Sequence, residues 1–111
     1  MYEKNLNIGY LLDFYGDVLS ERKRYVLDMY YNEDFSLAEI SEEIGISRQG
    51  VRDIIKKTEE ELCFFESKLG LSKKMTDLAD MTDSLLAIAT DTGASSTVCD
   101  GIAELKKRIE Q

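Results

Sequence analysis

Apolar residues recur every three or four positions through most of the chain, which is the spacing of amphipathic helices. The pattern predicts one helix over residues 5–15, ended by Gly16, and a second from the cap Ser20 to about Tyr31. Two more are expected near the C-terminus, over about 73–90 and 96–110. The predicted inward faces of the first two helices are Leu6, Leu11, Leu12 and Tyr15, and Val26, Leu27, Met29 and Tyr30. The last two helices carry apolar stripes, which can pack against residues 62–69 or against a second copy of the chain: Leu78, Met81, Leu85 and Ile88, and Val98, Ile102, Leu105 and Ile109. Because alternating β-branched runs are few and Pro is absent, we expect an all-α fold.

Residues 36–58 predict two short helices joined by a tight turn. Ser36 and Glu39 have the spacing of a capping box, so the first helix should begin there. Gly45 can adopt the left-handed conformation that ends a helix, and Ser47 can cap the helix that follows. This arrangement is typical of a helix-turn-helix motif.

The second helix of the motif has one apolar side and one polar side. Val51, Ile54, Ile55 and Thr58 share the first, whereas the second carries Arg48, Gln49, Arg52, Asp53 and Lys56. Arg and Gln can make paired hydrogen bonds to guanine and adenine in the major groove, and Lys can meet phosphate. We therefore expect the DNA-binding residues to be Ser47, Arg48, Gln49, Arg52, Lys56 and Lys57. An ordinary amphipathic helix with a solvated polar face, or a protein-binding helix-turn-helix, would show a similar periodicity.

This helix is predicted to continue beyond the motif. A heptad-like seam runs to Gly70 through Val51, Ile55, Thr58, Leu62, Phe65 and Leu69. Phe64 points off the seam, which indicates either that the distal half is covered on two sides or that one aromatic side chain is partly exposed. We expect a helix-turn-helix domain over residues 1–70 and a helical extension over 71–111 that serves packing or dimerisation.

The segments from Val18 to Tyr31 and from Phe35 to Asp53 resemble the YlxM-like family. These are small bacterial helix-turn-helix proteins whose motif is similar to region 4 of sigma factors, and whose gene commonly lies beside those for the signal recognition particle GTPases. The resemblance covers residues 5–74 best. It implies an all-α, cytoplasmic, regulatory protein with a link to the signal recognition particle pathway. Gene neighbourhood is the basis of that link, so a protein or ribonucleoprotein of the pathway is the alternative partner to double-stranded DNA.

The charge of the chain opposes nucleic-acid binding, but its distribution is uneven. Fourteen basic and 22 acidic residues give a net charge of −8, and phosphate repels an acidic protein. Residues 47–57, however, carry four basic residues against Asp53, and residues 20–24 carry three against Glu21. We expect positive charge to gather where the recognition helix and its supporting helix would meet DNA, with weak non-specific affinity.

The predicted helices also carry more apolar surface than a 111-residue monomer easily hides. Leu62, Phe64, Phe65 and Leu69 lie on the long helix, and a further stripe lies on the last helix. A symmetric homodimer is therefore expected, in which the C-terminal helices hold two DNA-reading helices at a fixed separation. Folding back within a monomer is the alternative.

Two acidic stretches could indicate other chemistry. Asp91, Thr92 and Gly93 form the Asp-Thr-Gly triplet of aspartic proteases, but that chemistry needs a β-sheet cradle, and the surrounding residues predict helices. We therefore interpret the triplet as a helix-connecting turn. The aspartates at 77, 80 and 83 lack a calcium-binding loop and are interpreted as a solvated face.

Catalysis, cofactors and metal binding are not expected. Cys63 and Cys99 have no CxxC spacing, and the chain has no His, so both are interpreted as reduced thiols in packing roles. No apolar run approaches 18 residues, and the N-terminus lacks the layout of a signal peptide. We therefore expect a cytoplasmic protein without membrane insertion.

Overall fold

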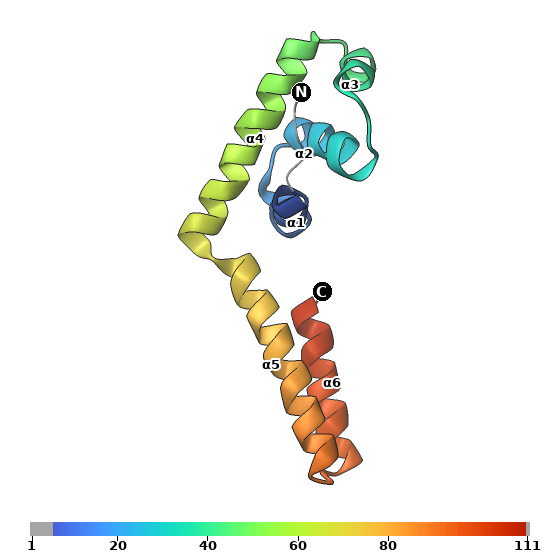
Figure 1. Ribbon diagram of the computed structural model, residues 1–111, viewed down its shortest axis with the longest axis vertical. Coiled ribbons are helices and arrows are strands. Elements are labelled where there is room, and N and C mark those ends of the chain that lie inside the picture. The colour runs from blue at the N-terminus through green and yellow to red at the C-terminus, as the bar shows by residue number, and fades with distance from the viewer. Residues whose placement is uncertain (1–5, 111) are drawn as a thin grey trace. The chain divides into compact units, whose positions relative to one another are not determined.

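The computed structural model describes residues 6–110, and all regular structure in this part of the chain is helical (Figure 1). The six α-helices within it are α1 (Leu6–Tyr15), α2 (Glu21–Leu27), α3 (Leu37–Ile44), α4 (Arg48–Leu69), α5 (Leu71–Asp91) and α6 (Ser96–Glu110). A 3-10 turn, η1 (Gly16–Val18), follows α1, and a π-helical turn, η2 (Asp28–Asn32), extends α2. The predicted all-α fold is confirmed. The chain divides between Leu69 and Gly70 into two compact units.

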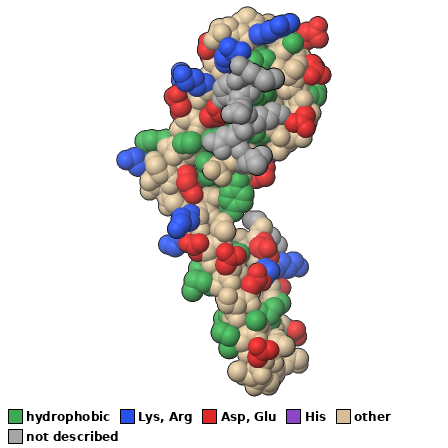
Figure 2. All heavy atoms as spheres, in the orientation of Figure 1, with side chains coloured by type: hydrophobic (Ala, Val, Ile, Leu, Met, Phe, Trp, Pro, Cys, Tyr) green, Lys and Arg blue, Asp and Glu red, His purple; other side chains and the backbone are tan. Residues whose placement is uncertain are grey.

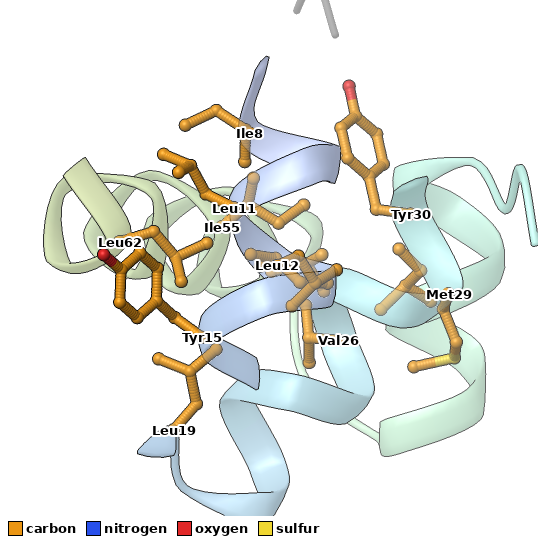
Figure 3. Close-up of a cluster of buried hydrophobic side chains, with 13 residues drawn as sticks. Ile8, Leu11, Leu12, Tyr15, Leu19, Val26, Met29, Tyr30, Ile55 and Leu62 are labelled. Atoms are coloured by element: carbon orange, nitrogen blue, oxygen red, sulfur yellow. The ribbon is translucent and has the colours of Figure 1, made fainter. Parts of the chain in front are cut away.

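In the N-terminal unit, helices α1, α2 and α3 all pack against the long helix α4. Figure 3 shows side chains of α1 gathered among those of α2, η2 and α4. The predicted inward residues of the first two helices are buried wherever the structure describes them, while the side chain of Leu6 lies outside the described residues. The buried hydrophobic cluster consists of Ile8, Leu11, Leu12, Tyr15, Leu19, Val26, Leu27, Met29, Tyr30, Ile40, Val51, Ile55 and Leu62.

A hydrogen bond and an ion pair join α1 and α2 to the distal half of α4. The hydroxyl group of Tyr15 donates a hydrogen bond to Oε1 of Glu66 at 2.6 Å. The ammonium group of Lys23 pairs with Oε2 of Glu61 at 2.8 Å, and both side chains are about one third exposed. Because these contacts join residues 38 or more positions apart, they help to define how the helices pack.

Glu59 is a partly buried carboxyl group on α4 that accepts a hydrogen bond from the hydroxyl group of Tyr31. Burial raises the pKa of Glu59 from 4.5 to about 7, because desolvation disfavours the charged form. The folded protein thus binds this proton more tightly than the unfolded chain does. The contribution of protonated Glu59 to the free energy of unfolding is therefore fully present below pH 4.5 and is lost as the pH rises through about 7.

Three expectations for the N-terminal unit can be compared with the structure. Helix α1 ends at Tyr15, directly before Gly16, as expected; Gly16 itself is buried and begins the 3-10 turn η1. The seam of α4 is fully buried as far as Leu62, but Leu69 is 57% exposed. Phe64 is also 57% exposed, so this aromatic ring is not covered as a second packed side would require.

In the C-terminal unit, α5 and α6 lie side by side as a helical hairpin (Figure 1). The Asp-Thr-Gly triplet lies where α5 ends: Asp91 is the last residue of α5, and Thr92 and Gly93 begin the connection. Gly93 has a φ of +73°, so the predicted helix-connecting turn is confirmed. The backbone N–H of Ala94 donates to the carbonyl group of Ala89 at 2.9 Å, which closes the end of α5.

Most of the predicted apolar stripe of α5 is not covered within the hairpin. Met81, Leu85 and Ile88 are exposed, whereas Thr82 and Ala89 are buried. Sequence periodicity locates the apolar stripe of a helix but does not show which side a neighbouring helix will occupy. In this hairpin, Thr82 and Ala89 of α5 are covered, whereas Met81, Leu85 and Ile88 lie along one open side.

The remaining candidate chemical groups lie mostly at the surface. Cys63 is exposed and Cys99 is partly buried; both thiols are free, and the expected packing role of Cys63 is therefore wrong. Asp77, Asp80 and Asp83 are exposed as expected, and Asp83 pairs with Lys106. Within residues 6–110, no helix is long and apolar enough to cross a membrane, and no group of three or more potential His, Cys, Asp or Glu metal ligands occurs.

Candidate nucleic-acid interface

The first helix of the motif, α3, begins with the predicted capping box. The backbone N–H of Glu39 donates to Oγ of Ser36 at 3.1 Å, and the N–H of Ser36 donates to Oε1 of Glu39 at 2.9 Å. The hydrogen bonds with Ser36 hold the pKa of the Glu39 carboxyl group below its usual value. Both exposed amide groups at the start of α3 thereby gain partners, so the beginning of this helix is defined locally.

The turn between α3 and α4 follows from three small residues. Gly45 has φ +72° and ψ +34°, and its N–H donates to the carbonyl group of Ser41 at 2.9 Å. The Ser41 hydroxyl group in turn donates to the carbonyl group of Ile46. At the start of α4, Oγ of Ser47 accepts the N–H of Gly50 at 3.0 Å, so the predicted second cap is confirmed.

Gly50 faces back toward the turn. A Cβ atom at this position would lie 3.2 Å from Cδ1 of Ile46 and 3.3 Å from Oγ of Ser47. Ile46 is partly buried against the core, so its side chain has limited room to move. The absence of a side chain at Gly50 is therefore explained by packing within the motif and does not require close approach of a ligand.

One side of α4 is anchored in the core, and the other carries the predicted contact residues. Val51, Ile55 and Thr58 are fully buried. All six predicted DNA-binding residues are exposed, from Ser47 to Lys57, and they span about 15 Å of helix. Figure 2 shows Lys and Arg side chains near the end where α3 and α4 meet, with acidic side chains close to them. The structure thus brings the predicted residues together on the first three turns of one helix.

Asp53 belongs to this surface, although it was not among the predicted contact residues. Its Oδ1 atom accepts a hydrogen bond from Nε2 of Gln49 at 2.9 Å. The bond holds the Gln49 amide group in one orientation and places a negative charge within the basic surface. The spacing of four residues on a helix is the sequence signal that could have revealed the pair.

The expected support from Arg22, Lys23 and Arg24 is not as predicted. Lys23 pairs with Glu61, which lies 13 residues beyond Arg48 and therefore about 20 Å along α4. Arg24 pairs with two carboxylates close to it in the sequence, Asp17 and Asp28. Two of the three charges are thus engaged in ion pairs, Lys23 with a distant residue on α4 and Arg24 with residues seven and four positions away.

Acidic residues limit the basic surface on two sides. Helix α3 carries Glu39, Glu42 and Glu43 and no basic residue, and α4 carries three consecutive glutamates at 59–61. From residue 36 to residue 57, four acidic residues balance four basic ones. Within residues 36–57, the first three turns of α4 are therefore the part that would attract a phosphate backbone.

A capped first helix, a left-handed glycine turn and a second helix with a buried and an exposed side define a helix-turn-helix protein. The chain belongs to the family UPF0122, whose model is described as "Putative helix-turn-helix protein, YlxM / p13 like" and matches residues 2–101. The resemblance inferred from the sequence is thereby confirmed.

Relatives in this family align with most of the chain. A UPF0122 protein of Halalkalibacterium halodurans is 43% identical over 110 residues, which cover 99% of this chain and all of the relative. A UPF0122 protein of Thermoanaerobacter sp. (strain X514) is 39% identical over 104 residues, covering 91% of this chain and 89% of the relative. The helix-turn-helix class of the family suggests nucleic-acid binding.

Proposed function

We propose that this chain is a cytoplasmic, non-enzymatic regulatory protein that binds double-stranded DNA and reads the major groove with the first three turns of α4. The observation that carries the proposal is the exposed set of Arg, Gln and Lys side chains on a helix whose opposite side is fully buried. Such a helix is held rigidly at its base and presents its N-terminal turns outward, as helix-turn-helix recognition requires.

The proposed roles differ along the helix. Arg48, Gln49 and Arg52 would contact base edges, since Arg pairs with guanine and Gln with adenine through two hydrogen bonds each. Lys56 and Lys57, one turn further on, would neutralise phosphates, and the hydroxyl group of Ser47 would bind a phosphate oxygen. With about two to four phosphate contacts, the logarithm of the binding constant should fall with the logarithm of the salt concentration with a slope of roughly −2 to −4.

A second candidate function is supported by the charge balance of the motif. The acidic surface of α3 would be repelled by phosphate but could face basic groups of a protein. In this alternative, α3 and α4 bind a protein or ribonucleoprotein of the signal recognition particle pathway. The resemblance described above is the source of that pathway link.

Selection from random duplexes, followed by fluorescence anisotropy on the enriched site, tests the main proposal. Replacing Arg48 or Arg52 by Ala should weaken binding to the enriched site by about 5- to 150-fold, which corresponds to ~1–3 kcal/mol, with little change on a scrambled duplex. Replacing Lys56 by Ala should weaken binding to both duplexes similarly and reduce the salt slope by about one.

Lys74→Ala is the matched control, because it removes the same charge from an exposed position outside the motif. It should leave both affinities unchanged. Failure to enrich any duplex, or equal losses for Arg48, Arg52 and Lys74 variants, would contradict base reading. Capture of a signal recognition particle component that is abolished by Arg52→Ala would then favour the second candidate.

A further inference from the structure

The C-terminal hairpin has an open apolar groove along one side. The groove is lined mainly by Leu78, Met81, Leu85 and Ile88 of α5 and by Leu105 and Ile109 of α6. Asp80 is the one charged side chain among the described lining residues. Such depletion of charge is characteristic of the central part of a permanent protein interface.

The hairpin buries little of its own apolar surface. In residues 70–110, the buried side chains are Ser72, Thr82 and Ala89, and none of them is a large hydrophobic residue. By contrast, five large apolar side chains of the hairpin are between 47% and 66% exposed: Met81, Leu85, Ile88, Val98 and Leu105. Two helices with this burial gain little stability from each other, so covering the groove would supply most of the missing hydrophobic stabilisation. Figure 2 shows hydrophobic side chains reaching the surface of this hairpin.

We propose that the groove is the interface with a second copy of this chain, and that two α5–α6 hairpins pack face to face as a four-helix bundle. A groove formed along a pair of helices fits a second pair, and equal surfaces on both partners satisfy two-fold symmetry. Charge argues against an anionic membrane or nucleic acid as the occupant, because residues 70–111 contain seven acidic and five basic residues.

The groove supplies a substantial part of the area that such an interface needs. Full burial of an aliphatic side chain removes on the order of 100 Å² from water, so the four exposed side chains that line the groove, Met81, Leu85, Ile88 and Leu105, offer about 200–250 Å² of apolar surface per copy. A standard interface buries about 800 Å² per partner, of which about two thirds is apolar in homodimers. These four residues would thus supply roughly two fifths of the apolar area, and Leu78, Ile109 and the rim can contribute to the remainder.

Multi-angle light scattering and sedimentation of the full chain test this assignment. At micromolar concentration, without nucleic acid, the mass should be twice the 12.7 kDa of one chain. The double variant Leu85→Lys, Ile88→Lys should associate at least 100-fold more weakly. The matched control Ala87→Lys, Thr90→Lys adds the same two charges at exposed positions of α5 that do not line the groove, and it should remain dimeric.

A measurement on the unmodified chain locates the contact even if the groove variant fails to fold. In a mixture of isotope-labelled and unlabelled protein, filtered nuclear Overhauser effects should join the methyl groups of Leu85, Ile88 and Leu105 to a second copy. A monomeric mass for the unmodified chain would overturn the proposal and would leave the groove to the N-terminal unit or another protein. Intermolecular contacts confined to Phe64 and Leu69, or a groove variant that stays dimeric, would also overturn it. None of these outcomes depends on DNA binding.

Discussion

Replacing Gly45 by Ala isolates the backbone cost of the helix-turn-helix turn. Gly45 has a φ of +72°, which disfavours residues with a side chain. A Cβ atom built there would meet no atom within 4 Å. Overlap with residues beyond the two chain neighbours therefore contributes nothing, and the loss of stability should equal the local cost of holding Ala in the left-handed region, about 1–2 kcal/mol.

Gly9→Ala is the matched control in the same unit. Gly9 lies within α1, outside the positive-φ region, and an added Cβ atom would make an ordinary contact of 3.8 Å with Cδ1 of Tyr31. The same chemical change should therefore stabilise the protein by ~0.5–1 kcal/mol, because Ala is the better helix former. The expected effects at Gly45 and Gly9 have opposite signs and differ by about 2 kcal/mol.

Urea denaturation followed by circular dichroism at 222 nm measures both changes, and this choice suits a chain without Trp. In thermal denaturation of a unit of this size, the melting temperature should fall by roughly 4–16 °C for Gly45→Ala and rise by a few degrees for Gly9→Ala. Gly45→Val should cost more than Ala, since β-branching makes positive φ still less favourable. If Gly45→Ala leaves stability unchanged or raises it as Gly9→Ala does, the turn does not depend on left-handed geometry and our reasoning is wrong.

Three further substitutions test the core, the titration of α4 and the basic surface. Leu62→Ala should cost ~2–5 kcal/mol in urea denaturation because Leu62 is fully buried, whereas Leu69→Ala, at a largely exposed position, should cost well under half as much. The unmodified protein should lose about 1–2 kcal/mol of stability between pH 4.5 and about pH 7, a value that allows for solvent screening of the half-buried Glu59. Glu59→Gln should remove this loss, because Gln does not titrate. An unchanged pH profile would contradict the raised pKa. Asp53→Ala should tighten binding to all duplexes several-fold in fluorescence anisotropy, since it removes a negative charge facing phosphate and releases Gln49; unchanged affinity would exclude Asp53 from the interface.

The features that the sequence determined are those that depend on neighbours within about four residues. Ser36 and Glu39 form the capping box, and Gly45 adopts the positive φ that a helix end requires. Ser47 caps α4, and α4 ends at Leu69 before a second left-handed glycine, Gly70. Each of these follows from hydrogen bonds or backbone sterics between residues close in the chain, so no knowledge of the tertiary structure was needed. The exposure of the predicted contact residues also followed, because a helix with one strong apolar side has its polar side determined by geometry.

The tertiary structure alone decided which apolar and charged groups acquire partners. Lys23 pairs with Glu61 of α4, 38 residues further along the chain, which engages a charge that the sequence placed in support of DNA binding. In α5, the choice between covering Thr82 and Ala89 or covering Met81, Leu85 and Ile88 depends on where α6 lies. Helical periodicity is a property of one helix, whereas burial and ion pairing depend on the relative position of two, and that position follows from packing between residues far apart in the sequence.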